Sequence, residues 1–208
     1  MSDMSKLLSW GIENSVPGAP DDSKRTQLDP ALLAKFFGNT KDDSTVMKES
    51  MAAILDPEMP LPDKEIAFDN FELCVENLDN ANNIENLKLW PPLLSQLSAH
   101  ESELRFMAAW CCGTAVQNNF KSQEAMHRHG GVSKLVDLVL RDPEEKVRSK
   151  AVYALSSQIR NQGPSLKEAL ELLPEEIALK KDMDAEDMDA IDVLIQSLRE
   201  RVKKVING

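Results

Sequence analysis

Two neighbouring cysteines are the residues of this chain most capable of covalent or metal chemistry. Cys111 and Cys112 lie in the stretch AAWCCGTAVQNN, residues 108–119. A thiolate can act as a nucleophile or as a metal ligand, but zinc sites and thioredoxin-like redox sites use a C-x-x-C spacing that this pair lacks. The spacing therefore favours a structural role for both cysteines over a thiol or metal enzyme.

The histidines offer no stronger site. His127 and His129 occur together in MHRHGG, residues 126–131, but on one helix they would point about 200° apart and could not share a metal ion. Gly130 and Gly131 predict the end of that helix, where a histidine cation is favourable. The usual motifs for phosphate binding, serine hydrolysis and zinc proteolysis do not occur. We predict no catalytic residue, no metal and no cofactor.

The segments that hold the cysteines form a repeat. DKEIAFDNFELCVEN, SELRFMAAWCCGTAVQN and EEKVRSKAVYALSSQIRN align without an internal gap, and Ala67, Ala108 and Ala151 correspond at offsets of 41 and 43 residues. Periods of about 40–47 residues built from two or three helices are typical of HEAT and armadillo solenoids. Each unit buries an incomplete apolar face, so neighbouring units must stack to complete the core.

The repeat assigns a role to the cysteines. Cys111 aligns with Ala154 and Cys112 with Leu155, so the equivalent positions are small or apolar. A free cysteine packs as a modest hydrophobe in such a position. We therefore expect both thiols to lie in the core between repeats.

Composition supports a helical chain with an acidic surface. Of 208 residues, 42% are hydrophobic and only 5% aromatic, and Leu, Ala, Met, Glu and Lys favour helix. A net charge of -11 disfavours binding to nucleic acid and to anionic membranes. The sequence has no apolar run that could span a bilayer, no evident signal peptide and too few cysteines for a disulfide framework. We expect a cytoplasmic protein.

Asparagines gather where the repeats turn. ENLDNANNIENLKLW, residues 76–90, holds five asparagines within ten residues, and QNN at 117–119 and RNQ at 160–162 occupy the corresponding corners. Asparagine caps helix ends, which accounts for roughly half of these residues. Amides along a solenoid edge would also form a hydrogen-bonding surface. We predict a partner-binding site made of Glu76, Asn77, Asn80, Ala81, Asn82, Asn83, Asn118, Asn119, Arg160 and Asn161.

Ordered motifs between residues 5 and 163 resemble a known family. LLSWGIENS, VMKESMAAIL, AFDNFELCVENLDNANNIENLKLW and MAAWCCGTAVQNN are similar to the armadillo-type nucleotide exchange factors of cytosolic 70-kDa heat-shock chaperones, and the fungal members match best. HGGVSKLVDLVLRDPEEKVRSKAVYALSSQIRN, residues 129–161, resembles an armadillo repeat. Longer members of the family carry further repeats, whereas this chain leaves the pattern near residue 163 and ends at residue 208.

The resemblance implies an all-α fold, a right-handed superhelical armadillo-type solenoid with a helical N-terminal segment and a C-terminal capping helix. We expect a flexible segment with a short helix at 1–28 and N-terminal capping helices at 29–62. Armadillo-like repeats follow at 63–163, divided into 63–101, 102–143 and 144–163. A connector and the capping helix complete the chain at 164–208.

The resemblance also implies a co-chaperone function without catalysis. In the family, the solenoid grips lobe II of the chaperone's ATPase domain and distorts the nucleotide cleft, so that ADP leaves, ATP enters and the client protein is released. We expect a monomer that binds this partner. The N-terminal segment of family members assists client release, and the matching residues here are Leu7, Leu8, Trp10 and Ile12.

Two kinds of binding protein remain as alternatives. A nuclear-import adaptor also uses armadillo repeats, but it needs W-x-x-x-N ladders, and here Trp110 is followed by Thr114 and the equivalent later position is Ser157. An armadillo scaffold or peptide-binding adaptor without exchange activity would share the same fold. Measuring ADP release from the chaperone distinguishes an exchange factor from either alternative.

Overall fold

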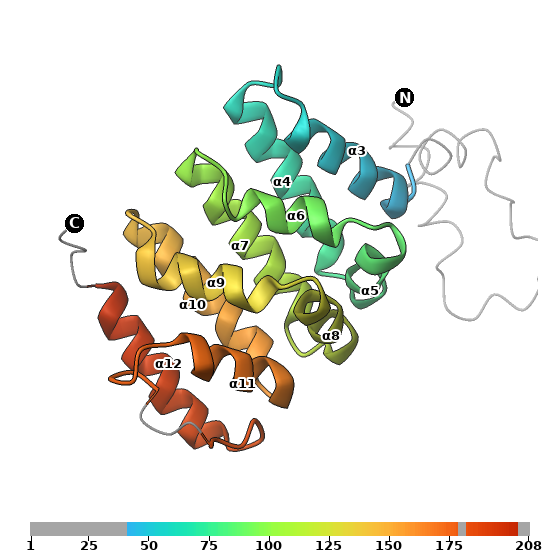
Figure 1. The fold of residues 1–208 in the computed structure, drawn as a ribbon. Coiled ribbons are helices and arrows are strands. Elements are labelled where there is room, and N and C mark those ends of the chain that lie inside the picture. The colour runs from blue at the N-terminus through green and yellow to red at the C-terminus, as the bar shows by residue number, and fades with distance from the viewer. Residues whose placement is uncertain (1–40, 179–181, 204–208) are drawn as a thin grey trace, which may run out of the picture. The chain divides into compact units, whose positions relative to one another are not determined.

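The computed structural model describes residues 41–178 and 182–203 of the chain (Figure 1). Every regular element within these residues is an α-helix, which confirms the predicted all-α class. The chain divides into two units between Asp42 and Asp43, and the helices described below belong to the second unit. The predicted short helix of residues 1–28 and the client-release residues Leu7, Leu8, Trp10 and Ile12 lie outside the described residues. The predicted N-terminal capping region, residues 29–62, is described from residue 41 on and contains the helix Asp43–Leu55.

The helices carry the numbers of Figure 1, and their bounds follow in chain order: α3 (Asp43–Leu55), α4 (Leu61–Val75), α5 (Leu78–Asn86), α6 (Trp90–Gln96), α7 (Ser102–Val116), α8 (Phe120–Arg128), α9 (Gly131–Arg141), α10 (Glu145–Ile159), α11 (Gly163–Leu172) and α12 (Met188–Val202). None of these described helices is long and apolar enough to cross a membrane.

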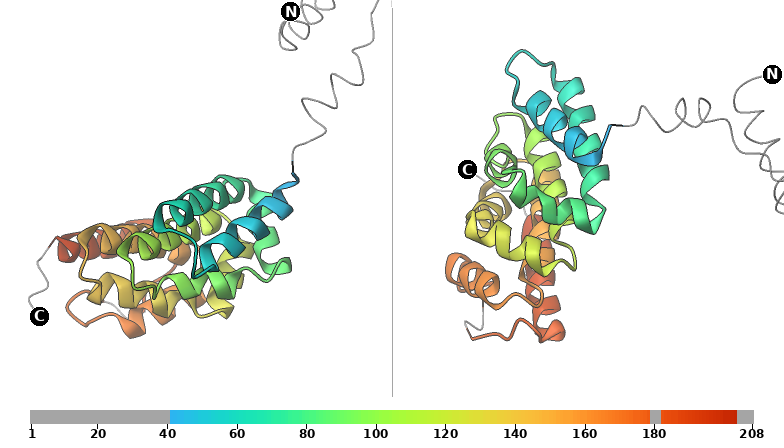
Figure 2. Two further views of the ribbon diagram at one scale, coloured as in Figure 1. Left: turned by 90° about the horizontal axis from the view of Figure 1, so that it is seen from above. Right: turned by 90° about the vertical axis from the view of Figure 1, so that its right-hand side faces the viewer.

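Three helices of equal length form one layer of the unit. α4, α7 and α10 each span 15 residues, and their last residues, Val75, Val116 and Ile159, correspond in the sequence repeat. They lie side by side, while α6, α9 and α11 form a second layer beside them (Figures 1 and 2). Successive units therefore stack as in a helical solenoid. The predicted repeat boundaries at 101/102 and 143/144 fall in the loops before α7 and α10.

The core lies between the two layers. Its largest fully buried side chains include Trp90, Phe68 and Phe71, and it continues from α3 through α12. Cys111 and Cys112 are fully buried within it, which confirms their predicted packing role. Close approach of α7 to α10 depends on Gly113, because a Cβ there would meet the ring of Tyr153.

The last helix covers the end of the stack. α12 packs on α10 and α9, and its apolar stripe, which includes Ile191, Ile195 and Leu198, is buried. Arg148, itself buried, donates hydrogen bonds of 2.8 and 3.3 Å to the carbonyl oxygen of Val202 at the end of α12. A cation at a helix C-terminus complements the helix dipole. This contact fixes α12 to the solenoid.

Candidate partner-binding site

The thiols do not form a reactive centre. Burial raises the pKa of Cys111 well above its ordinary value and raises the pKa of Cys112 to about 12. The Sγ atom of Cys111 lies 3.8 Å from the carbonyl oxygen of Phe68, to which it donates a weak hydrogen bond. Because the thiolate is the nucleophilic form, both side chains behave as neutral core residues near neutral pH.

The two adjacent histidines face different helices. Nδ1 of His127 lies 3.1 Å from a carboxylate oxygen of Glu168 on α11, and Nε2 of His129 lies 2.9 Å from a carboxylate oxygen of Glu85 on α5. Among the residues that the structure describes, no group of three or more His, Cys, Asp or Glu side chains could hold a metal ion. The two imidazoles thus lie beside separate carboxylates on α11 and α5 and do not converge on one ligand.

A groove crosses α4, α7 and α10 where these helices end. It consists of two adjoining hollows of about 380 and 460 Å³, which share Gln117, Asn118 and Tyr153. The smaller hollow is lined in addition by Glu72, Glu76, Trp110 and Thr114. The larger one is lined in addition by Phe120, Gln123, Ser156, Ser157, Arg160, Asn161 and Arg199. The groove is therefore acidic at the α4 end and basic at the α10–α12 end.

The acidic hollow contains a carboxylate that is almost buried. The Glu72 side chain belongs to a residue only 8% exposed, and one of its oxygens accepts a 2.7 Å hydrogen bond from the hydroxyl of Thr114. Glu76 follows one helical turn later and is exposed. Residues four apart share one face of a helix, so Glu72 on α4 and Glu76, the C-cap of α4, project to the same side.

An aromatic cluster borders the same hollow. The rings of Phe106 and Trp110 meet edge to face, with centroids 6.0 Å apart. The ammonium group of Lys150 lies 4.1 Å from the Trp110 ring centroid, 5.0 Å from that of Phe106 and 5.4 Å from that of Tyr153. Such placement favours a cation. Burial nevertheless lowers the pKa of Lys150, and the charge of Glu72 opposes that shift.

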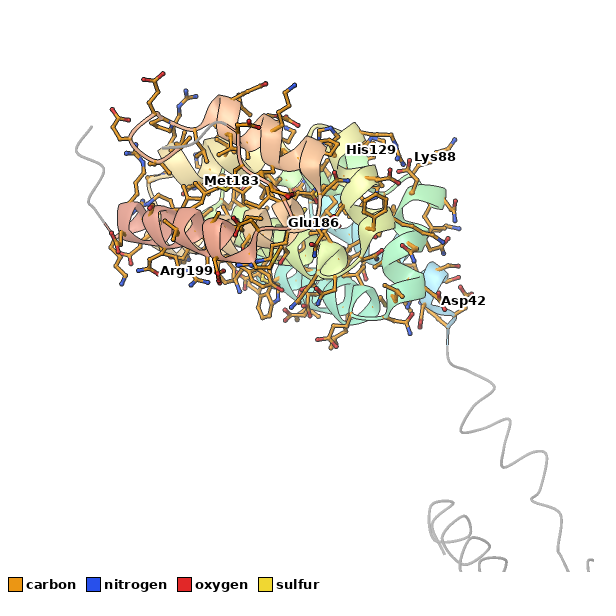
Figure 3. All side chains as sticks on the ribbon, turned by 90° about the horizontal axis from the view of Figure 1, so that it is seen from below. Asp42, Lys88, His129, Met183, Glu186 and Arg199 are labelled. Carbon is orange, nitrogen blue, oxygen red and sulfur yellow. The ribbon has the colours of Figure 1, made fainter. Side chains whose placement is uncertain are left out.

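The basic hollow is held by contacts with α12. Arg160 forms an ion pair with Asp192 and donates to the Ser156 hydroxyl at 3.3 Å. Arg199 projects from α12, well apart from His129 in the view of Figure 3. The connector returns the chain to this corner, where the amide nitrogen of Asn161 donates to the carbonyl oxygen of Ala185 at 2.9 Å. Helix α12 thus supplies one wall of the groove.

The corner asparagines have two different roles. Two residues separate α4 from α5, whereas three separate α7 from α8 and α10 from α11. Asn118 and Asn161 are the middle residues of the two three-residue corners. They adopt a left-handed backbone conformation, with φ of 51° and 56°, which asparagine tolerates well. Asn77 instead caps α5 and accepts from the amide of Asp79 at 2.9 Å, and Asn119 caps α8 in the same way. At the corner between α4 and α5, Asn77 therefore differs in structure from the residues that correspond to it in the sequence repeat.

The structure brings only part of the predicted site together. Glu76, Asn118, Arg160 and Asn161 line the groove. The other predicted asparagines of the first corner belong to α5 or its cap and do not line either hollow: Asn77, Asn80, Asn82 and Asn83. Asn80 donates to Asp43 at 2.6 Å and to the carbonyl oxygen of Cys74 at 3.0 Å, so its amide is used to join α3, α4 and α5.

Two predicted contact residues lie inside the protein, which corrects their assignment to an exposed surface. Ala81 is 2% exposed and belongs to the core, and Asn119 is 4% exposed. The Asn119 amide donates to the carbonyl oxygen of Ala115 and to the Ser122 hydroxyl. A bulky side chain at Ala81 would have to displace α5, so we expect it to affect stability as well as any binding through that helix.

The residues that line the groove and were not predicted from the sequence are Glu72, Trp110, Thr114, Gln117, Phe120, Gln123, Tyr153, Ser156, Ser157 and Arg199. Trp110 and Tyr153 correspond in the sequence repeat, and this correspondence indicated that both lie on one face of the layer formed by α4, α7 and α10. Arg199 could not be assigned in this way, because its sequence context explains it equally well as a complement to the dipole of α12.

Comparisons with known proteins identify the family. Residues 4–84 match the model of the nucleotide exchange factor Fes1, and residues 80–174 match that of the SIL1/FES1/HPBP1 C-terminal domain. A protein of Coccidioides immitis is 46% identical over 207 residues, which cover 96% of this chain and 98% of the relative. The chain belongs to the Fes1 family. The resemblance stated from the sequence is thereby confirmed.

Further Fes1 relatives have similar identities. A protein of Gibberella zeae is 48% identical, with 97% of each chain covered. One of Neurospora crassa is 47% identical over 85% of this chain and 74% of its own length. All three relatives bear the name Hsp70 nucleotide exchange factor FES1, or fes-1 in the last case.

Proposed function

We propose that this protein is a nucleotide exchange factor of a cytosolic Hsp70 chaperone. The observation that carries the proposal is the identity of 46–48% with Fes1 relatives over nearly the whole of both chains. The protein would bind the ATPase domain, on its lobe II, and accelerate the release of ADP. ATP would then bind and the chaperone would release its client, which supports protein folding.

The mechanism needs binding energy and no chemical step. Suppose that the protein binds an ATPase domain with an opened nucleotide cleft more tightly than one with a closed cleft. The protein then lowers the affinity of the ATPase domain for ADP, and bound ADP lowers the affinity of the ATPase domain for the protein by the same factor. A coupling of about 3 kcal/mol corresponds to roughly 150-fold. We therefore propose that the protein is not an enzyme, and that it acts in the cytoplasm as a monomer.

A rigid, polar surface is the property that this mechanism requires, and the groove over α4, α7 and α10 has it. Glu76, Asn118, Arg160 and Asn161 line that groove. The backbone at Asn118 and Asn161 is held in a left-handed conformation, and the Arg160 side chain is paired with Asp192, so little freedom of this backbone and of Arg160 is lost on binding. We propose that this groove and the adjacent edge of α5 contact the chaperone.

The release of a fluorescent ADP analogue from the chaperone, followed by stopped flow, tests the proposal. Micromolar protein should accelerate release at least tenfold, and the absence of any acceleration would refute exchange activity. Binding to the ATPase domain without acceleration would instead favour the armadillo scaffold. Truncation of the N-terminal segment, which includes Leu7, Leu8, Trp10 and Ile12, should leave ADP release unchanged and slow client release.

Variants locate the surface in the same assay. Asn118→Ala and Arg160→Ala should each weaken binding to the ATPase domain several-fold, because each removes hydrogen-bonding groups from the groove. Arg141→Ala is the matched control, since Arg141 lies on α9, is 78% exposed in its side chain and pairs with Asp137 one turn away, outside the groove. If all three variants bind the ATPase domain with the same affinity as the unchanged protein, the contact surface lies elsewhere.

A further inference from the structure

The acidic hollow contains a carboxylate for which the described residues supply no ion pair. Glu72 accepts one hydrogen bond from Thr114, and no lysine, arginine or histidine of the described chain lies within 4.0 Å of its oxygens. A nearly buried carboxylate usually has a cationic partner, because removing a charge from water is costly. The position of Glu72 at the edge of a hollow leaves one oxygen available for such a partner.

The surroundings of Glu72 suit a cationic group from another molecule. The hollow measures about 380 Å³, enough for one long side chain, and its lining also includes Glu76, Gln117 and Asn118. The amide oxygen of Gln117 accepts a hydrogen bond of 3.2 Å from the Tyr153 hydroxyl and, like the other oxygens, can accept a second. An arginine or lysine head group presents only donors, and these acceptors match it. Trp110 and Tyr153, which also line the hollow, offer apolar surface to the methylene stem that such a side chain carries.

The protein's own lysine occupies the neighbouring cation position. Lys150 lies over Trp110 at 4.1 Å, close enough to Glu72 for the two charges to interact, yet without a hydrogen bond between them. Its ammonium group therefore forms cation–π interactions with the rings, while its attraction to the Glu72 carboxylate acts without a hydrogen bond. A second cation that entered the hollow would bind Glu72 and Glu76 directly and would be repelled by Lys150.

We infer that the hollow formed by Glu72, Glu76, Trp110 and Thr114 is a socket for an arginine or lysine side chain of the Hsp70 ATPase domain, with Lys150 as a built-in competitor. The inference rests on the proposed function and adds to it the chemistry of one contact. The inference orients the partner on the groove: its cation enters at the α4 end, while Arg199, which lines the hollow together with ion-paired Arg160, faces an acidic group of the partner at the α12 end.

The test compares charge-neutral variants in binding to the ATPase domain. Glu72→Gln keeps an oxygen that can accept from Thr114, so the fold is preserved, and affinity should fall about tenfold, which is about 1.4 kcal/mol. Glu76→Gln, at the exposed rim, should lose about threefold. Lys150→Met keeps an apolar stem on the rings and should gain about threefold, because the competing charge is gone.

The matched control is Glu171→Gln, which removes the same charge from an exposed position on α11 away from the groove. Raising the salt concentration should shrink the differences between variants, since exposed charge pairs are screened. Should Glu72→Gln and Glu76→Gln bind like Glu171→Gln while the unchanged protein accelerates ADP release, the socket is refuted and the exchange function stands. Weaker or unchanged binding of Lys150→Met would likewise overturn its role as competitor. If the unchanged protein fails to accelerate release, the proposed function fails and the socket with it.

Discussion

A methyl group added at Gly113 would have no room between α7 and α10. An ideal Cβ there would lie 2.4 Å from Cε1 and 2.7 Å from Cδ1 of Tyr153, and 3.1 Å from the Cα atom of Ala154. The ring of Tyr153 is half-buried and can turn outward. The backbone of Ala154 can move only together with α10. Gly113→Ala should therefore shift α10 slightly and push the Tyr153 ring into the groove.

Two opposing effects decide the change in the free energy of unfolding. Replacing glycine by alanine within a helix stabilises it by about 1 kcal/mol. Overpacking of a close-packed interface costs about 1–3 kcal/mol, and the half-buried ring relieves part of the closest contact. The expected result is a net loss of about 1 kcal/mol, or a melting temperature lower by about 2–4 °C for a chain of this size.

Denaturation in urea measures this change, and a second pair of variants assigns its cause. In the background of Tyr153→Ala, the same substitution at Gly113 should be nearly neutral, which gives an interaction energy of about 1 kcal/mol between the two positions. Gly113→Ala should also weaken chaperone binding, because Tyr153 lines both hollows. A Gly113→Ala protein more stable than the unchanged one by the full helix-propensity gain would refute the reasoning.

Three further predictions concern the core, the thiols and one surface ion pair. Leu155→Ala, at a fully buried position, should destabilise the protein by about 2–5 kcal/mol in chemical denaturation, and a loss below about 1 kcal/mol would argue against close packing there. In the native protein at pH 8, a disulfide reagent should label half-buried Cys74 first and Cys112 only at the rate of unfolding, since burial raises the Cys112 pKa to about 12. Labelling of both thiols at one fast rate would contradict the burial of Cys112. A hydrogen bond from Lys146 holds the pKa of Glu103 at about 2, so its stabilising effect is complete above about pH 4.5 and is lost as the pH falls toward 2. Glu103→Gln should flatten that part of the stability profile in acid titration, and an unchanged profile would show that the pair contributes nothing.

Much of the fold follows from local sequence pattern. The aligned segments, in which Val75, Val116 and Ile159 correspond, predict three equivalent helices. The structure has three helices of 15 residues that end at these positions. Alignment of Cys111 and Cys112 with small or apolar residues likewise predicts their burial. Such inferences succeed because apolar periodicity and repeat spacing are properties of neighbouring residues along the chain.

The candidate site was predicted less completely, and Asn77 explains why. Its repeat equivalents, Asn118 and Asn161, adopt a left-handed conformation at the groove, whereas Asn77 caps α5 because its corner is one residue shorter. An aligned sequence does not reveal that difference, since one residue in a corner changes the backbone conformation without changing the residue types. Ala81 shows the same limit, because its burial depends on how α5 packs against the rest of the core.

The amino-acid sequence alone was sufficient for the helical class, the repeat, the core role of the thiols and membership of the Fes1 family. Each depends on patterns that recur along the chain. Only the tertiary structure decided which side chains share one surface: Glu72 on α4, Trp110 on α7, Tyr153 on α10 and Arg199 on α12 are distant in sequence and meet at one groove. Stacking of helices sets these neighbours, because the contacts between layers join residues whose separation along the chain carries no local signal.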